Sequence, residues 1–422
     1  MSQANPPSSP IPPEQTLSLE EARRILHDSV SPISGSEVVA IRAALGRILA
    51  DDVIAPVDVP AHDNCAMDGY AVRAADLHSD VATRLQLVGT ALAGSSFNGE
   101  VLAGETVRVM TGAVLPKGSD TVVMQEIVQA DGQCVLIPPA QKLGQHVRRA
   151  GEDLGAGRPA LLAGKRIGPA ELGLIASLGF AEVSVRRRLR VAFFSTGDEL
   201  ASIGNTLAPG QVFDSNRYTL FGALTRLGVE LIDMGVVRDD PAAMETTFME
   251  ASAQADVILT TGGVSVGDAD YVKELMGRLG EVGFWKINIK PGRPLAFGRL
   301  NHGTRPVWMF GLPGNPVAVM VTFYQLVADV LLKMSGVYPL PPRATFSVPC
   351  LTSIRKQPGR SEFPRGRLEL VHGQWQVGLA GNQGSGVLRS MSEANCFIVL
   401  PEAQGNVAVG DRVDVQLFEG LF

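Results

Sequence analysis

Residues 256–279 read DVILTTGGVSVGDADYVKELMGRL, and this stretch decides the fold. The apolar run Val257 to Leu259 is typical of a buried strand, and a glycine-rich turn follows it. Apolar residues then recur at the i, i+3, i+4, i+7 spacing of a helix, at Val272, Leu275, Met276 and Leu279. The stretch therefore predicts a strand, a loop and a helix in succession.

The loop in this stretch has the composition of a phosphate-binding turn. Gly262, Gly263 and Gly267 allow backbone N–H groups to approach an anion at the start of the helix, where the helix dipole also favours negative charge. The same turn carries Asp268 and Asp270, which would repel a bare phosphate. A cation such as Mg²⁺ would join these carboxylates to a phosphate. The sequence therefore predicts a phosphorylated ligand held through a metal ion.

Strands and helices alternate on both sides of this stretch. Strands are expected over 191–195, 229–237 and 307–310, and helices over 216–227, 241–253 and 316–334. This alternation predicts an α/β domain with a doubly wound, mostly parallel sheet that is covered on both faces. Ligands of such a sheet bind at the carboxyl ends of its strands.

Charged residues gather where these strands end. The acidic pairs are Asp198 and Glu199, Asp239 and Asp240, and Asp268 and Asp270. Further on, Lys286 and Lys290 alternate with isoleucines, so both are expected on one side of a strand, and Arg293 adds a third cation. Carboxylates for a metal beside fixed cations suit a phosphate ester, a pyrophosphate or another oxyanion. An ordinary solvated surface is the alternative interpretation.

The N-terminal region follows other patterns. The first 15 residues hold five prolines and neither the apolar nor the basic run of a signal peptide, so we expect a disordered tail. Ser18, with Glu21 three residues later, predicts the start of a helix, and the helical pattern continues to Leu49.

Two other segments are rich in short strands. Residues 56–150 contain β-type runs between glycine-rich turns, which predicts a small β-rich domain. Residues 338–422 begin with a proline-rich joint and continue with short strands and glycines, which predicts a separate β-barrel or sandwich.

Composition limits the classes of function. The net charge is −6 and the pI is about 5.6, and the chain has no Lys/Arg run beyond 186–188, which argues against nucleic-acid binding. No run approaches the roughly 18 apolar residues of a membrane span. The four cysteines are far apart, so neither a disulfide framework nor a zinc cluster is indicated, and a reducing cytoplasm is the expected setting.

One motif allows a different reading. Residues 263–267 match the G-x-S-x-G turn that carries the nucleophile of α/β serine hydrolases, with Ser265 as the serine. That chemistry needs a histidine after the serine, and only His302 and His372 follow. A hydrolase would also leave the acidic pairs and the lysines without a role. The chain has no Walker A, G-x-G-x-x-G or H-E-x-x-H motif.

Seven motifs taken together resemble the molybdopterin molybdenumtransferases, the family of MoeA and the gephyrin E domain. They are DNCAMDGYAVR (63–73), VMTGAVLP (109–116), VRRAGEDL (147–154), TGDEL (196–200), TTGGVSVGDADY (260–271), KINIKPGRP (286–294) and GLPGNP (311–316). GRSEFPRG (359–366) and GSGVLRSM (384–391) resemble C-terminal motifs of the family. Each motif is modest evidence, but seven in the family's order are highly specific.

The resemblance implies an elongated homodimer of four-domain subunits. It divides the chain into a discontinuous linker and dimerisation domain (16–55 plus 151–187), a β-rich domain (56–150), an α/β molybdopterin-binding domain (188–337) and a C-terminal β-barrel (338–422). It also implies that molybdate is inserted into adenylylated molybdopterin with release of AMP, in a step that depends on Mg²⁺ or Zn²⁺. Contacts with the molybdopterin adenylyltransferase and with downstream cofactor-maturation proteins are expected, and contacts with nucleic acid or membranes are not.

By motif match, the catalytic residues are Asp68, Thr111, Asp153, Glu199, Asp239, Asp270, Lys286 and Lys290. The expected ligand-binding residues are Thr196, Gly197, Gly262, Gly263, Ser265, Gly267, Asp268, Arg293, Pro313, Gly314 and Asn315, with Arg365 and Ser385 as further candidates for the molybdate pocket.

We expect Glu199, Asp239 and Asp270 to position the metal or an attacking water, and the two lysines to stabilise phosphate or molybdate. Asp68 and Asp153 would reach in across the dimer. Cys65 departs from the family, where many relatives have a small hydroxyl residue. Two further alternatives stay open: a non-catalytic molybdopterin carrier or scaffold, and the adenylyltransferase that resembles the α/β domain.

Overall fold

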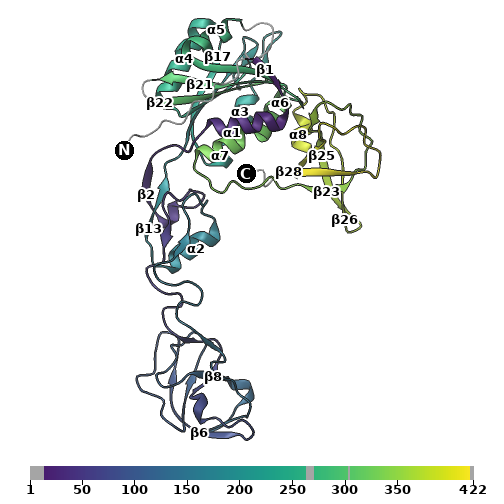
Figure 1. The fold of residues 1–422 in the computed structure, drawn as a ribbon. Helices are drawn as coiled ribbons and strands as arrows, with labels where there is room; N and C mark the ends of the chain where they lie inside the picture. The colour runs from purple at the N-terminus through teal and green to yellow at the C-terminus, as the bar shows by residue number, and fades with distance from the viewer. Residues whose placement is uncertain (1–13, 263–269, 303–304, 419–422) are drawn as a thin grey trace.

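The computed structural model describes residues 14–262, 270–302 and 305–418. Figure 1 shows an α/β domain with the C-terminal domain beside it and a long arm that leads away from both. We use "arm" for residues 36–186, which contain a small unit near the α/β domain and a β-rich unit at the tip. The chain leaves for the arm through residues 30–35 and returns through 187–189.

The α/β domain is built on a mixed sheet of seven strands from the described chain. Their order is β1 (Glu14–Leu17), β19 (Gly280–Ile287), β21 (Pro294–His302), β22 (Arg305–Leu312), β18 (Val257–Thr261), β14 (Arg190–Thr196) and β17 (Glu230–Val237). The pairs β14–β17, β14–β18, β18–β22 and β1–β19 are parallel. Only β21 runs antiparallel to both of its neighbours. The expected mostly parallel arrangement is therefore present, with an antiparallel strand inserted.

Helices cover both faces of this sheet. On one face, α1 (Leu19–Ser29), α3 (Asn216–Leu227), α6 (Pro316–Thr322) and α7 (Ala328–Met334) pack against the same core as Val191 and Phe193. On the other face, α4 (Pro241–Gln254) and α5 (Asp270–Leu279) pack against Ala192 and Phe194. Successive strand residues point to opposite faces, so the continuous apolar run of β14 serves both cores.

The N-terminal segment differs from the sequence prediction. Glu14 and Gln15, which were expected to belong to the tail, pair with β19 as part of β1. Ser18 and Glu21 form the predicted capping box of α1. The helix ends at Ser29 and not at Leu49. Residues 14–29 also pack on the α/β domain and not on the linker unit, because they bury apolar side chains in its core.

The arm is held together by long-range strand pairing. β2 (Ser36–Ala40), where a helix was expected, pairs antiparallel with β13 (Glu182–Arg186), and α2 (Pro169–Ser177) packs nearby. The tip has the predicted β-rich character. Its sheet runs in the order β8 (Thr121–Met124), β5 (Gly69–Val72), β7 (Glu105–Val109), β6 (Thr83–Ala91), β10 (Cys134–Ile137) and β9 (Gln129–Asp131).

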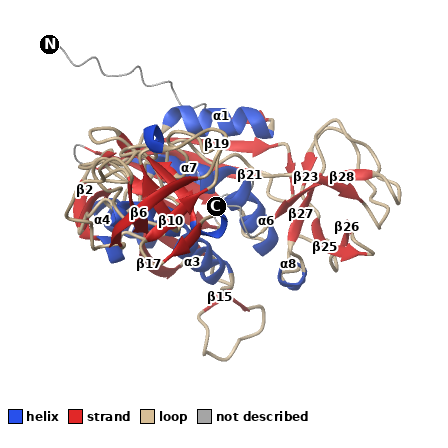
Figure 2. Ribbon diagram, turned by 90° about the horizontal axis from the view of Figure 1, so that it is seen from below, coloured by secondary structure: helices blue, strands red, loops and turns tan. Residues whose placement is uncertain are grey.

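The C-terminal domain, which includes α8 (Arg389–Glu393), lies to one side of the α/β domain, near α6, when the molecule is seen from below (Figure 2). Within the described residues its main sheet runs in the order β23 (Phe346–Pro349), β28 (Arg412–Leu417), β27 (Cys396–Val399), β25 (Arg365–Val371) and β26 (Gln374–Leu379). A single bridge between Cys350 and Val377 joins the two edges of the sheet. A closed barrel stays a prediction.

The segment Pro316–Met334 is the one described helical stretch that is long and apolar enough to cross a membrane. However, 83% of its apolar window is buried inside the protein, as expected of a core helix. The segment contains a turn of π-helix, Phe323–Val327, between α6 and α7.

Candidate functional site

A cavity of about 1150 Å³ lies between the α/β domain and the C-terminal domain. Glu199, Gly262 and Gly314 line its α/β wall, and they lie just after β14, β18 and β22. The carboxyl ends of adjacent parallel strands meet at one edge of a sheet, which brings these three turns together. Pro313 and Asn315 also line the cavity. The cavity therefore lies at the carboxyl ends of these strands, where the sequence analysis expects ligands to bind.

The turn after β18 requires glycine at its first position. Gly262 has φ +87°, and a Cβ atom there would lie 2.5 Å from the carbonyl oxygen of Thr196. Both the backbone conformation and the close approach therefore exclude a side chain. Thr196 itself is buried, and neither Thr196 nor Gly197 is among the residues that line the cavity.

Polar side chains missed by the sequence analysis support this wall. Asn216, the first residue of α3, lines the cavity and donates its side-chain N–H to the carbonyl oxygen of Gly314 over 2.7 Å. Asp214 also lines the cavity and accepts from the Ser195 hydroxyl over 2.9 Å and from Arg217. Asp-Ser directly before a predicted helix that begins with Asn is a local signal that could have found them.

An acidic cluster lies beside this wall. The backbone N–H of Asp239 donates to the Asp198 carboxylate over 3.3 Å. Burial raises the pKa of the Asp239 carboxyl, and the charges of Asp198 and Glu199 raise it further. A bound cation would relieve this repulsion.

The predicted metal site is incomplete in the structure. Among the residues whose side chains are described, no group of three His, Cys, Asp or Glu could hold a metal ion. Asp270 begins α5, but its side chain lies outside the described residues. Gly263, Ser265, Gly267 and Asp268 also lie outside them.

The two lysines expected on one strand face are separated. Lys286 lies in β19 and does not line the cavity. Lys290 lies in β20 (Ile289–Lys290), which leaves the main sheet and pairs with β24 (Ser361–Glu362) of the C-terminal domain. Lys290 lines the cavity together with Arg293, and its ammonium lies 3.2 Å from the Glu362 carboxylate. The two lysines therefore lie in separate strands and not in one continuous strand as expected.

The C-terminal domain contributes a buried cation. Arg365 is 1% exposed and lines the cavity with Ser385. Its guanidinium donates to Ser390 Oγ over 3.1 Å and to the carbonyl oxygens of Asn382 and Gly384 over 2.9 and 3.1 Å. These acceptors are all neutral, and burial lowers the pKa of the guanidinium. A buried cation whose described partners carry no charge is suited to bind an anion.

The predicted residues on the arm do not join the cavity of their own chain. Asp68 accepts from the backbone N–H and the hydroxyl of Thr111 over 2.7 and 2.8 Å, and these hydrogen bonds lower the pKa of its carboxyl. Asp153 is exposed, and its backbone N–H donates to the carbonyl oxygen of Val59. Cys65 is buried in the core of the tip, and burial raises the pKa of its thiol to about 11. All four belong to the arm, which leads away from the other two domains (Figure 1). The described residues that line the cavity all come from those two domains.

Comparison with known proteins covers most of the chain. Residues 17–179 match the MoeA N-terminal region (domain I and II), residues 192–333 a probable molybdopterin binding domain, and residues 347–418 the MoeA C-terminal region (domain IV). A molybdopterin molybdenumtransferase of Haemophilus influenzae is 41% identical over 96% of this chain and 99% of the relative. The chain belongs to the molybdopterin molybdenumtransferase family.

Other members of the molybdopterin molybdenumtransferase family are also similar to this chain over nearly its full length. The Nostoc sp. enzyme of that name is 36% identical over 96% of this chain and 94% of its own length. The crystal structure of a molybdopterin biosynthesis MoeA protein from Pyrococcus horikoshii OT3 has a TM-score of 0.82 at 29% identity, covering 96% of this chain and all of that one. Membership leaves the serine hydrolase reading without support; His372 does not line the cavity.

Proposed function

We propose that the protein inserts molybdate into adenylylated molybdopterin and releases AMP, as a step of molybdenum cofactor biosynthesis. The observation that carries this proposal is Arg365, a buried cation that lines the cavity and has only neutral partners among the described residues. Molybdate is an oxyanion of the kind that such a guanidinium binds. Family membership supports the same reaction.

The cavity has separate chemistry on its two walls. Arg365 and Ser385 belong to the C-terminal domain and would hold molybdate. Gly262 and Gly314 follow strands of the α/β domain, where the backbone can approach the phosphates of the adenylylated pterin. Lys290 stands where the two domains meet and would stabilise negative charge during transfer. The two substrates would thus be held face to face.

A divalent cation fits the electrostatics of the acidic cluster. Glu199 and Asp239 would bind it with Asp270, and it would neutralise charge on the phosphates. Mg²⁺ and Zn²⁺ are distinguished by titrating each into metal-free protein and following AMP release. A rate that is independent of both would remove the cation from the proposal.

We also propose that two copies of the chain complete each site, with the arm of one copy supplying Asp68, Thr111 and Asp153 to the cavity of the other. Subunit mixing tests this. A heterodimer with Asp68→Ala in one subunit and Arg365→Met in the other has one intact site if the arm acts on the partner. About half of the wild-type activity is then expected, and activity no greater than that of the two parent variants would contradict the proposal.

A test for catalytic turnover distinguishes the proposed transferase from a non-catalytic molybdopterin carrier. The protein is mixed with adenylylated molybdopterin, Mg²⁺ and molybdate, and AMP is measured by chromatography. Release of AMP that depends on molybdate supports the transferase, whereas tight binding without release supports the carrier. ATP consumption with metal-free molybdopterin would instead indicate an adenylyltransferase. We place the protein in the cytoplasm, in contact with the adenylyltransferase that supplies its substrate and the proteins that take its product.

A further inference from the structure

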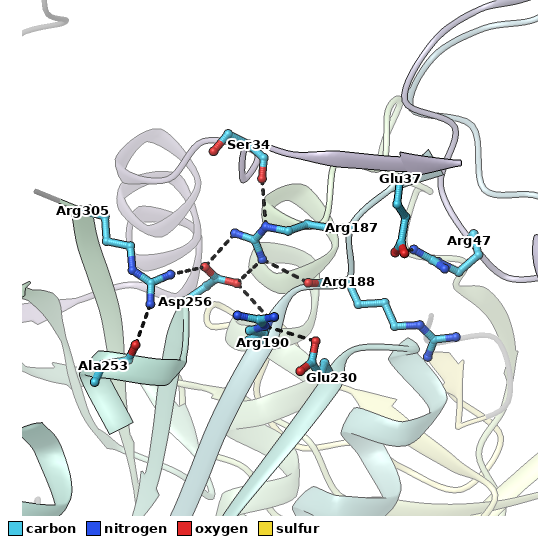
Figure 3. Close-up of polar contacts among 10 residues, drawn as sticks. All are labelled: Ser34, Glu37, Arg47, Arg187, Arg188, Arg190, Glu230, Ala253, Asp256 and Arg305. Atoms are coloured by element: carbon cyan, nitrogen blue, oxygen red, sulfur yellow. Dashed lines mark hydrogen bonds and ion pairs between the residues drawn. The ribbon is translucent and has the colours of Figure 1, made fainter. Parts of the chain in front are cut away.

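A buried carboxylate lies where the arm joins the α/β domain. Asp256, at the start of β18, is 6% exposed and makes ion pairs with two arginines (Figure 3). Arg187 binds both of its oxygens, over 2.7 and 2.9 Å, and Arg305 lies 3.2 Å away. The backbone N–H of Arg190 donates to it over 3.0 Å. This junction is at the opposite end of β18 from Gly262, so it has no place in the cavity.

Arg187 also joins the two connections of the arm to each other. Its Nε donates to the carbonyl oxygen of Ser34 over 2.9 Å, and its backbone N–H donates to the carbonyl oxygen of Gly35 over 3.1 Å. Ser34 lies on the outgoing connection and Arg187 on the returning one. Gly35 has φ +105°, and a Cβ atom there would lie 3.2 Å from the Arg187 side chain. Residues 34 and 35 of the outgoing connection therefore pack directly against Arg187, which is bound to Asp256.

Arg187 and Arg305 offset the burial of the Asp256 carboxylate. Burial alone would raise the pKa of the Asp256 carboxyl, but the hydrogen bonds from Arg187 and Arg190 and the charges of Arg187 and Arg305 hold it below its usual value. The other contacts at the base of the arm include a backbone hydrogen bond from the N–H of Tyr338 to the carbonyl oxygen of Gly164, and a 3.3 Å hydrogen bond from the half-buried Arg166 to the carbonyl oxygen of Arg226. An ion pair in which Arg187 binds both oxygens of a carboxylate constrains the orientation of the arginine more than a single hydrogen bond does.

We infer that Arg187 is a positioning residue for the reaction: anchored on Asp256, it fixes the direction in which the arm leaves the α/β domain and so where Asp68 is presented. The inference rests on the proposed function, because the tip is needed at a cavity that it does not reach in its own chain. A small change of angle at the base becomes a large displacement at the end of a long arm. Misplacement of a reacting group by about 1 Å can cost 100-fold in rate.

The chain offers a matched control. Arg187→Gln and Arg305→Gln each remove one cation from Asp256, but only Arg187 touches the connections of the arm. Hydrogen exchange of the backbone, kcat for AMP release and the Kd for molybdate are measured on the full-length protein. Arg187→Gln should speed exchange at residues 34–36 and 187–190 about tenfold and lower kcat about 10- to 100-fold. Its molybdate Kd should stay within about twofold of wild type.

Arg305→Gln should leave exchange at these residues and kcat close to wild type. Equal effects of the two substitutions, with molybdate binding also lost, would show that Asp256 only stabilises the domain and would overturn the inference. Unchanged exchange or unchanged kcat in Arg187→Gln would overturn it as well. If Arg187→Gln does not fold, Arg187→Lys keeps the charge but cannot reach Asp256 and Ser34 together, and the same two losses are expected in smaller degree. Failure of the wild type to release AMP would refute the proposed function, and the exchange data would still decide the role of Arg187 in holding the arm.

Discussion

Replacement of Arg365 by methionine removes the buried charge that we propose binds molybdate. At an effective dielectric constant of about 20, unit charges about 4 Å apart attract by roughly 4 kcal/mol. Desolvation of the anion reduces this, and hydrogen bonds to charged groups contribute about 1.5–3 kcal/mol net. We therefore expect Arg365→Met to weaken molybdate binding by about 2–3 kcal/mol, or roughly 30- to 150-fold in Kd.

The same substitution should affect folding little. Methionine loses three hydrogen bonds to neutral acceptors, each worth about 1 kcal/mol, but it also removes a buried charge that has no carboxylate partner among the described residues. Isothermal titration with molybdate gives the Kd, and thermal denaturation reports folding.

Lys356→Met is the matched control. Lys356 is 4% exposed in the same domain, and its ammonium donates to the carbonyl oxygen of Gln404 over 2.7 Å, but it does not line the cavity. The control should lose stability and keep molybdate binding. A molybdate Kd for Arg365→Met within threefold of wild type would refute the reasoning.

Three other predictions concern the α/β wall. Asp239→Asn should raise the free energy of unfolding at pH 7, because the folded-state pKa of this carboxyl is raised and its ionised form is therefore disfavoured in the folded protein. This gain in the free energy of unfolding should shrink as the pH falls through the raised pKa. Urea denaturation at pH 7 and pH 4 measures the gain, and an equal gain at the two pH values would contradict the prediction. Gly262→Ala should cost about 1–3 kcal/mol, because alanine must adopt a positive φ against Thr196, and a wild-type melting temperature would argue against this. Chelation of divalent cations should stop AMP release but leave molybdate binding at Arg365 intact. AMP release and the Kd for molybdate are each measured in the presence of EDTA, and loss of molybdate binding as well as of AMP release would mean that the cation holds molybdate.

The sequence predicts most of the α/β domain because the signals there are local. The apolar spacing from Asn216 to Leu227 predicts a helix whose ends match those of α3. The capping residues Ser18 and Glu21 place the start of α1. Helices covering both faces of the sheet follow from the alternation of strands and helices, and the turns that carry Glu199 and Gly262 follow from strand ends.

Other parts depend on pairing between distant residues, which leaves no local signal. β2 and β13 lie side by side, but they come from opposite ends of the arm's sequence. The local pattern of β2 therefore predicts a helix and gives no sign of this pairing. Lys290 lies in a different strand from Lys286, because it pairs with Glu362, which is 72 residues further along the chain. Arg365 was found through its motif, but its burial beside the α/β domain could not be read from spacing. The arm residues are recognised by motif alone, since one chain does not bring them to the cavity.

The cavity between the α/β and C-terminal domains should hold molybdate at Arg365. Crystals of the protein soaked in molybdate, with diffraction recorded at the molybdenum absorption edge, test it most directly. We expect an anomalous peak beside the Arg365 guanidinium and Ser385. A bound molybdate located elsewhere, with this position left empty, would contradict the account.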